Sequence, residues 1–143
     1  MELLERLSRR QVQTLIAVQR GETPERGASL NEVARALRMR APSALEHLTA
    51  LEALHLVSRF RGKSRLTARG QACLAEYQRH HRVAESLFQQ LGLSAKDTHL
   101  AALEVDLALS HQTVDRLCAA EGHPQECPHG APIAPCRSRR GAG

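Results

Sequence analysis

The chain has 143 residues, of which 42% are hydrophobic, 24% charged and 2% aromatic, and its formal net charge is +5. This length suits one domain or two small ones and excludes a large multidomain enzyme. No apolar run approaches the roughly 20 residues that a transmembrane helix needs, and the N-terminus lacks the apolar core of a signal peptide, so we expect a cytoplasmic protein without a membrane partner.

The first predicted element is a helix from Glu2 to Arg20, because apolar residues recur there at helical spacing. Glycines and a proline in the following "RGETPERGA" predict a loop. Ser29 and Glu32 then form a capping-box pattern, in which the serine hydroxyl accepts from a helix amide and the glutamate reaches back to the cap amide. A second helix is therefore predicted to start at this point.

A third helix is predicted from Pro42 onward, because proline in the first helical turn costs no hydrogen bond and leucines then repeat along one face. Two short helices joined by a turn of three or four residues are typical of a helix-turn-helix. The strand-like runs "LVSRF" and "SRLT" flank the glycine-centred turn "RGK" and predict a β-hairpin wing.

Three further helices are predicted after the wing. The first continues from "ARGQA" through Gln90, the second runs from a cap at Ser94 to about Leu109, and the third covers His111–Ala120. Prolines and glycines after Gly122 favour an irregular tail.

The helix-turn-helix and the wing carry the candidate DNA contacts, because the second helix of this motif enters the major groove while a wing contacts phosphates. The candidates on that helix are Pro42, Ser43, Glu46, His47 and Thr49. The basic candidates in the turn and the wing are Arg38, Arg40, Arg59, Arg61 and Lys63. The low aromatic content disfavours single-strand binding by base stacking, so duplex DNA is the expected partner. A winged helix that docks proteins is the alternative.

A candidate metal site combines His81 and Glu85, which lie four residues apart and share a helix face, with His99 on the next helix. Imidazole and carboxylate ligands together suit zinc, manganese, iron or cobalt. By spacing alone, however, a partly exposed surface pair is the better interpretation of His81 and Glu85.

The cysteines are even in number, but a disulfide framework is not expected in the cytoplasm. Cys73 and Cys118 are expected to be small core residues. The potential soft ligands of the tail are His123, Cys127, His129 and Cys136. They could bind a soft ion, supply a missing ligand or sense redox state, although their spacing matches no zinc-finger pattern.

The segments "RHHRVAE", "LTARG" and "GHPQECPHGAPI", together with His99, resemble the diphtheria toxin repressor family of iron- and manganese-dependent transcriptional regulators. The resemblance extends to Ile133. It implies a mainly α fold, with a winged helix-turn-helix in residues 1–70, a helical metal-binding and dimerisation domain in 71–136 and a disordered tail in 137–143. The SH3-like third domain of some members is not expected.

By this resemblance, His81, Glu85 and His99 occupy the positions of the family's ancillary metal site. The primary-site positions fall on Arg10, Leu103, Asp106 and Leu107. Only Asp106 among these can bind a metal ion. His99 and Asp106 are separated by about 10 Å along a helix and cannot share one ion. We therefore expect a single site with an unidentified fourth ligand, and a solvated role, a capping role or a residual second site for Asp106.

The resemblance implies a metal-responsive repressor that binds a double-stranded operator as a homodimer, with manganese or iron as the expected ion and zinc or cobalt as alternatives. Apolar residues on more than one face of residues 94–120 also favour dimerisation. A regulator that responds to thiol oxidation or zinc, and an interaction module without metal control, remain alternatives. No phosphate-binding loop, nucleophile elbow or HExxH motif supports an enzyme.

Overall fold

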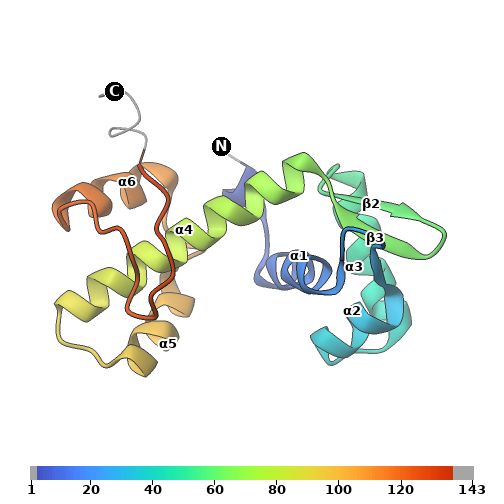
Figure 1. The fold of residues 1–143 in the computed structure, drawn as a ribbon, viewed down its shortest axis with the longest axis horizontal. Helices are drawn as coiled ribbons and strands as arrows, with labels where there is room; N and C mark the ends of the chain where they lie inside the picture. Colours follow the sequence, from blue (N-terminus) through green and yellow to red (C-terminus); the bar gives the residue numbers. More distant parts are fainter. Residues whose placement is uncertain (1–2, 137–143) are drawn as a thin grey trace. The chain divides into compact units, whose positions relative to one another are not determined.

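The computed structural model describes residues 3–136, so the predicted disordered tail at 137–143 lies outside the described residues (Figure 1). The described chain is mainly helical, which confirms the predicted fold class. It divides into two compact units, residues 7–75 and residues 3–6 with 76–136. This boundary falls after Ala75 rather than residue 70, and the first residues join the second unit. None of the helices in residues 3–136 is both long and apolar enough to span a bilayer.

The helix predicted from Glu2 to Arg20 is broken in two, so this prediction is wrong. A 3₁₀ helix, η1, covers Leu3–Arg6, and α1 covers Arg9–Gly21. Ser8 begins α1: its hydroxyl accepts a hydrogen bond from the Gln11 amide, and Gln11 Oε1 accepts one from the Ser8 amide. This capping box separates the two helices, and the Ser8–Gln11 pattern was the overlooked signal.

The helix-turn-helix follows its prediction closely. Helix α2 covers Leu30–Leu37, and α3 covers Ala41–Ala53 with a proline in its first turn. The predicted capping box of α2 is present, with both reciprocal hydrogen bonds between Ser29 and Glu32. Arg38 ends α2 in the left-handed conformation, at φ 52°, and so starts the short turn into α3.

The wing is also confirmed. Strands β2 (Val57–Phe60) and β3 (Lys63–Leu66) pair antiparallel, with Val57 opposite Leu66 and Phe60 opposite Lys63. The two residues between them, Arg61 and Gly62, both have positive φ, as type I′ hairpin turns require. A two-residue strand, β1 (Ala28–Ser29), adds to the other side of β3. It is too short to show a periodic pattern in the sequence.

The core of residues 7–75 is built from apolar side chains of the three helices and the hairpin. Its most deeply buried members are Val12, Leu15, Val18, Val33, Leu48, Leu51, Leu56 and Val57. These side chains leave the outer face of α3 and the wing to solvent.

The C-terminal unit is organised by α4, which covers Ala68–Gln90 as predicted. Helix α5 covers Ala95–Val105 and ends before the predicted Leu109, because Asp106 closes it and the chain turns there. Helix α6 covers His111–Ala120 as predicted.

The tail after α6 has no helix or regular strand, as predicted, and in residues 121–136 its one β-bridge joins Glu126 and Pro132. It crosses α4, whose Arg79 and Arg82 donate hydrogen bonds to tail carbonyl oxygens (Figure 1). The core between the tail, α4 and α6 contains Val83, Val114, Cys118, Cys127, Ile133 and Cys136. All four cysteines of the chain are buried.

Candidate metal centre

The three predicted ligands come together from α4 and α5. His81 Nε2 lies 3.1 Å from Glu85 Oε1 and 3.1 Å from His99 Nδ1. His99 Nδ1 lies 4.0 Å from Glu85 Oε2. His81 and Glu85 meet because residues four apart occupy one helix face, and α5 returns along α4 to add His99. The three potential ligand atoms therefore lie within 4.8 Å of one another.

A fourth side chain, His129, reaches the same carboxylate from the tail. Its Nδ1 lies 2.7 Å from Glu85 Oε2, and its ring centroid is 6.1 Å from that of His99. A tight turn presents it: the Cys127 and Gly130 amides donate to the Ala131 and Cys127 carbonyls, and Gly130 has φ 78°. Sequence reasoning noted His129 only as a tail ligand, because nothing local connects it with Glu85.

Asp106 does not have the solvated role that was one expectation for it. Its side chain is fully buried, and its Oδ2 accepts a hydrogen bond from the Tyr77 hydroxyl and lies 2.9 Å from His81 Nδ1. A carboxylate in this position holds a histidine with Nδ1 protonated and Nε2 available to a ligand. Asp106 also closes α5, which agrees with the expected capping role. No group of potential ligands in residues 3–136 includes it.

The donor set fits a divalent transition metal ion. Glu85 Oε2 is buried and accepts no hydrogen bond, although His129 Nδ1 lies close to it. An imidazole nitrogen and a carboxylate oxygen that face each other in this way match two ligands of one ion. His99 and His129 are about half exposed whereas Glu85 is buried, so an ion has a route to the carboxylate from solvent.

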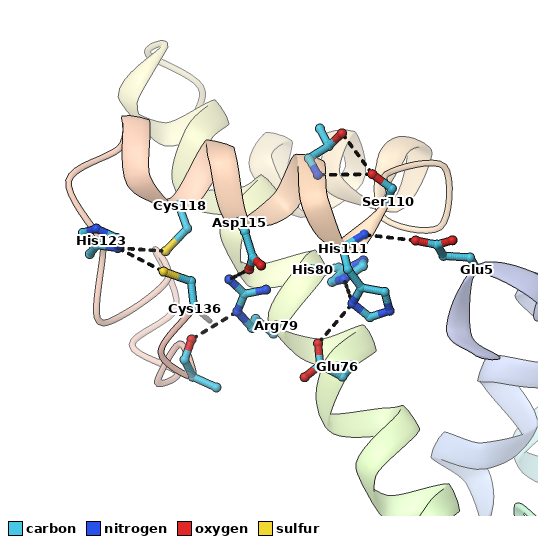
Figure 2. Close-up of polar contacts among 12 residues, drawn as sticks. Glu5, Glu76, Arg79, His80, Ser110, His111, Asp115, Cys118, His123 and Cys136 are labelled. Atoms are coloured by element: carbon cyan, nitrogen blue, oxygen red, sulfur yellow. Dashed lines mark hydrogen bonds and ion pairs between the residues drawn. The ribbon is translucent and has the colours of Figure 1, made fainter. Parts of the chain in front are cut away.

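A second group of potential ligands was missed from the sequence. His80 Nε2 lies 3.0 Å from His111 Nδ1, which is 3.3 Å from Glu76 Oε2 (Figure 2). Burial lowers the pKa of His80 to about 4, and the nearby His111 adds to the effect. His80 is therefore neutral at neutral pH. Its contact with His111 joins α4 and α6, and no local sequence pattern predicts that contact.

The predicted DNA contacts lie on the surface of residues 7–75. His47 and Arg59 are half-buried. The exposed members are Arg38, Arg40, Pro42, Ser43, Glu46, Thr49, Arg61 and Lys63. Phe60, which the sequence analysis did not single out, is 74% exposed beside the wing turn, and the Arg61 guanidinium lies over its ring. The wing therefore presents both positive charge and an exposed aromatic ring.

Residues 67–135 match the family "Iron dependent repressor, metal binding and dimerisation domain". No curated protein sequence matches the chain. Among similar solved structures, a hypothetical protein from Sulfolobus solfataricus is 27% identical with a TM-score of 0.83, over 90% of this chain and 99% of that protein.

Two further structures are a manganese-dependent transcriptional repressor in complex with manganese and ScaR with bound Zn²⁺. The first is 27% identical with a TM-score of 0.71, and the second is 23% identical with a TM-score of 0.75. Each is matched over 88% of this chain and 59% of its own length. Residues 67–135 therefore belong to the family of iron-dependent repressor metal-binding and dimerisation domains, and the chain is similar in fold to a manganese-dependent transcriptional repressor.

Proposed function

We propose that this chain is a transcriptional regulator whose binding to duplex DNA is controlled by a divalent transition metal ion, held by His81, Glu85, His99 and His129. The observation that carries the proposal is the convergence of three histidines on the buried carboxylate of Glu85. The exposed basic residues of the winged helix supply the second half of the function, because they can displace the counterions of DNA phosphates.

Manganese or iron is the proposed ion, with zinc or cobalt as alternatives. Imidazole and carboxylate ligands bind all four metals. One similar repressor is in complex with manganese, and ScaR has Zn²⁺ bound. When bound, the ion supplies positive charge that holds the carboxylate and the imidazoles together.

Ion binding would favour one conformation of this chain, the one in which the ligands lie together. Asp106 and Tyr77 orient His81, so one ligand is already in position. His99 on α5 and His129 on the tail then have to meet Glu85 on α4. An ion that binds only this arrangement shifts the population toward it. Helix α4 continues into residues 7–75, which gives a covalent route from the ion to the winged helix.

The working form is proposed to be a homodimer. The matched family domain is a dimerisation domain, and Leu91, Leu93 and Leu100 near the junction of α4 and α5 are exposed apolar side chains. Two winged helices in a dimer would contact half-sites about one helical turn of DNA apart. Sedimentation should give a dimer at micromolar concentration, and a monomer would contradict this part of the proposal.

The test is DNA binding by metal-stripped protein titrated with Mn²⁺, Fe²⁺, Co²⁺ and Zn²⁺. Glu85→Gln should lose the metal response, whereas Glu104→Gln, an exposed carboxylate on α5, should keep it. In the wild type, metal at a hundredfold excess over its dissociation constant should stabilise the fold by about 2.7 kcal/mol. Metal-dependent DNA binding that survives in Glu85→Gln would overturn the proposed site.

The same experiment separates the alternatives. An interaction module would bind no duplex with any ion. A thiol sensor would respond to oxidant instead, but burial, together with the nearby Cys136, raises the pKa of the Cys118 thiol. A protonated thiol is a poor nucleophile, so Cys118 is a poor candidate for the reactive cysteine of such a sensor.

A further inference from the structure

A cysteine pair and a histidine meet beside α6, where the described part of the tail reaches Cys136. His123 Nδ1 lies 3.6 Å from Cys118 Sγ and 3.3 Å from Cys136 Sγ (Figure 2). Both cysteines are buried, and His123 follows α6 with a positive φ of 56°. The group shares no residue with the cluster around Glu85.

The distances match one tetrahedral ion. Zinc binds sulfur at about 2.3 Å and nitrogen at about 2.0–2.1 Å, so the sulfur and nitrogen ligands of one tetrahedral ion are about 3.6 Å apart. Both observed separations lie within 0.3 Å of this value.

We propose that Cys118, His123 and Cys136 form a zinc site distinct from the one around Glu85. Two thiolates favour zinc over manganese, whereas the potential ligands around Glu85 are imidazoles and a carboxylate with Cys127 as the one thiol, so the two sites would prefer different ions. A cavity of about 250 Å³ borders the three side chains and leaves room for water as the fourth ligand. Binding of one Zn²⁺ would release the two thiol protons to solvent.

This site would anchor the tail. Cys118 lies in α6 and Cys136 ends the described tail, so an ion between them closes the segment that carries His129 into a loop. A cross-link of this kind limits the freedom of the intervening chain. The inference does not depend on metal control of DNA binding.

Cobalt substitution in the full-length chain tests the ligands. Co²⁺ bound by two thiolates gives strong thiolate-to-cobalt charge-transfer absorption. Wild type, His81→Ala and two cysteine controls, Cys73→Ser and Cys127→Ser, should show this absorption. Cys118→Ser and Cys136→Ser should lose it and bind one Zn²⁺ fewer per chain by elemental analysis. Absorption that persists in Cys136→Ser, or is absent from the wild type, would overturn the site.

A second measurement uses only the wild-type protein, so its result does not depend on whether the cysteine variants fold. X-ray absorption at the zinc edge, on protein loaded with one equivalent of Zn²⁺, should show two sulfur neighbours at about 2.3 Å. One sulfur neighbour or none would place zinc at Glu85, whose group of potential ligands includes Cys127, and would contradict the proposal. A chain whose Cys118 and Cys136 form a disulfide in air, and which takes up no zinc after reduction, would likewise contradict it.

Discussion

The two units of the molecule bury different kinds of side chain. In residues 7–75 the buried side chains are apolar apart from Thr14 and Ser64, and the charges lie outside. The other unit buries ionisable and polar groups throughout its interior. They are Arg79, His80, Glu85, Ser86, Thr98, Asp106 and His111.

The kind of core in each unit affects how that unit can bind a ligand. An apolar core stabilises a fold without help, so the winged helix can offer its exposed charges to a partner. Buried charges are costly unless they are paired or bind an ion. Arg79 is paired with Asp115 at 2.6 Å, whereas the carboxylate of Glu85 faces three imidazoles. All four groups of potential metal ligands found in residues 3–136 belong to this unit.

The largest expected effect tests whether the two units are energetically separate. Leu48 is fully buried in α3, so Leu48→Ala should destabilise residues 7–75 by about 2–5 kcal/mol and weaken DNA binding. Mn²⁺ affinity, measured by isothermal titration calorimetry, should stay unchanged because every proposed ligand lies in the other unit. A parallel loss of metal affinity would show that the units do not act separately.

A smaller effect is expected from the carboxylate behind His81. Asp106→Asn should lower metal affinity about 10–100-fold, or about 1.4–2.7 kcal/mol, because it weakens the group that orients the imidazole without removing a ligand. Tyr77→Phe, which removes the hydrogen bond from the Tyr77 hydroxyl to Asp106, should cost less. Unchanged affinity in Asp106→Asn would assign the buried carboxylate a purely structural role.

The wing gives the next effect. Arg61→Ala and Lys63→Ala should each reduce the slope of log affinity against log salt by about one unit, with equal weakening on all duplexes, because these exposed cations are expected to contact phosphates. Arg59→Ala should behave in the same way. Fluorescence anisotropy over a salt series provides the measurement. A change in sequence preference would mean that the wing contacts bases.

The smallest effect concerns a surface ion pair of the winged helix. The Arg26 side chain, with the Ser29 amide, lowers the pKa of Glu32 to about 2. A lowered carboxyl pKa contributes stability above the ordinary value of about 4.5, and this contribution disappears as pH falls through about 2. Glu32→Gln should therefore lower the melting temperature at pH 7 but not near pH 2. Glu25→Gln is the matched control and should show no such difference.

Local signals explain why so much of the winged helix could be predicted. Ser29 with Glu32, Pro42 and the turn at Arg61 and Gly62 each fix the chain within a few residues, and the structure has all three. The Ser8–Gln11 capping box, which separates η1 from α1, is an equally local signal that the sequence analysis overlooked. The end of α5 could not be predicted from local sequence, because Asp106 is held by side chains of another helix.

The C-terminal clusters could be predicted only in part. His81 and Glu85 share a helix face, so their proximity follows from the sequence, and His99 was added by its position on the next helix. Contacts of His80 with His111 and of Cys118 with Cys136 depend on how α6 and the tail return to the same region. The spacing of residues along the sequence does not show which distant segments pack together, unless that spacing matches a known motif.

The position of His129 in the tail sets an order of events during synthesis. Residues 7–75 emerge from the ribosome first and have a complete apolar core, so they can fold while later residues are still being added. Glu85 emerges soon afterwards, but its partner at 2.7 Å is added only when the tail is made. A nascent chain halted before His129 would therefore hold a finished winged helix and an unfinished carboxylate site.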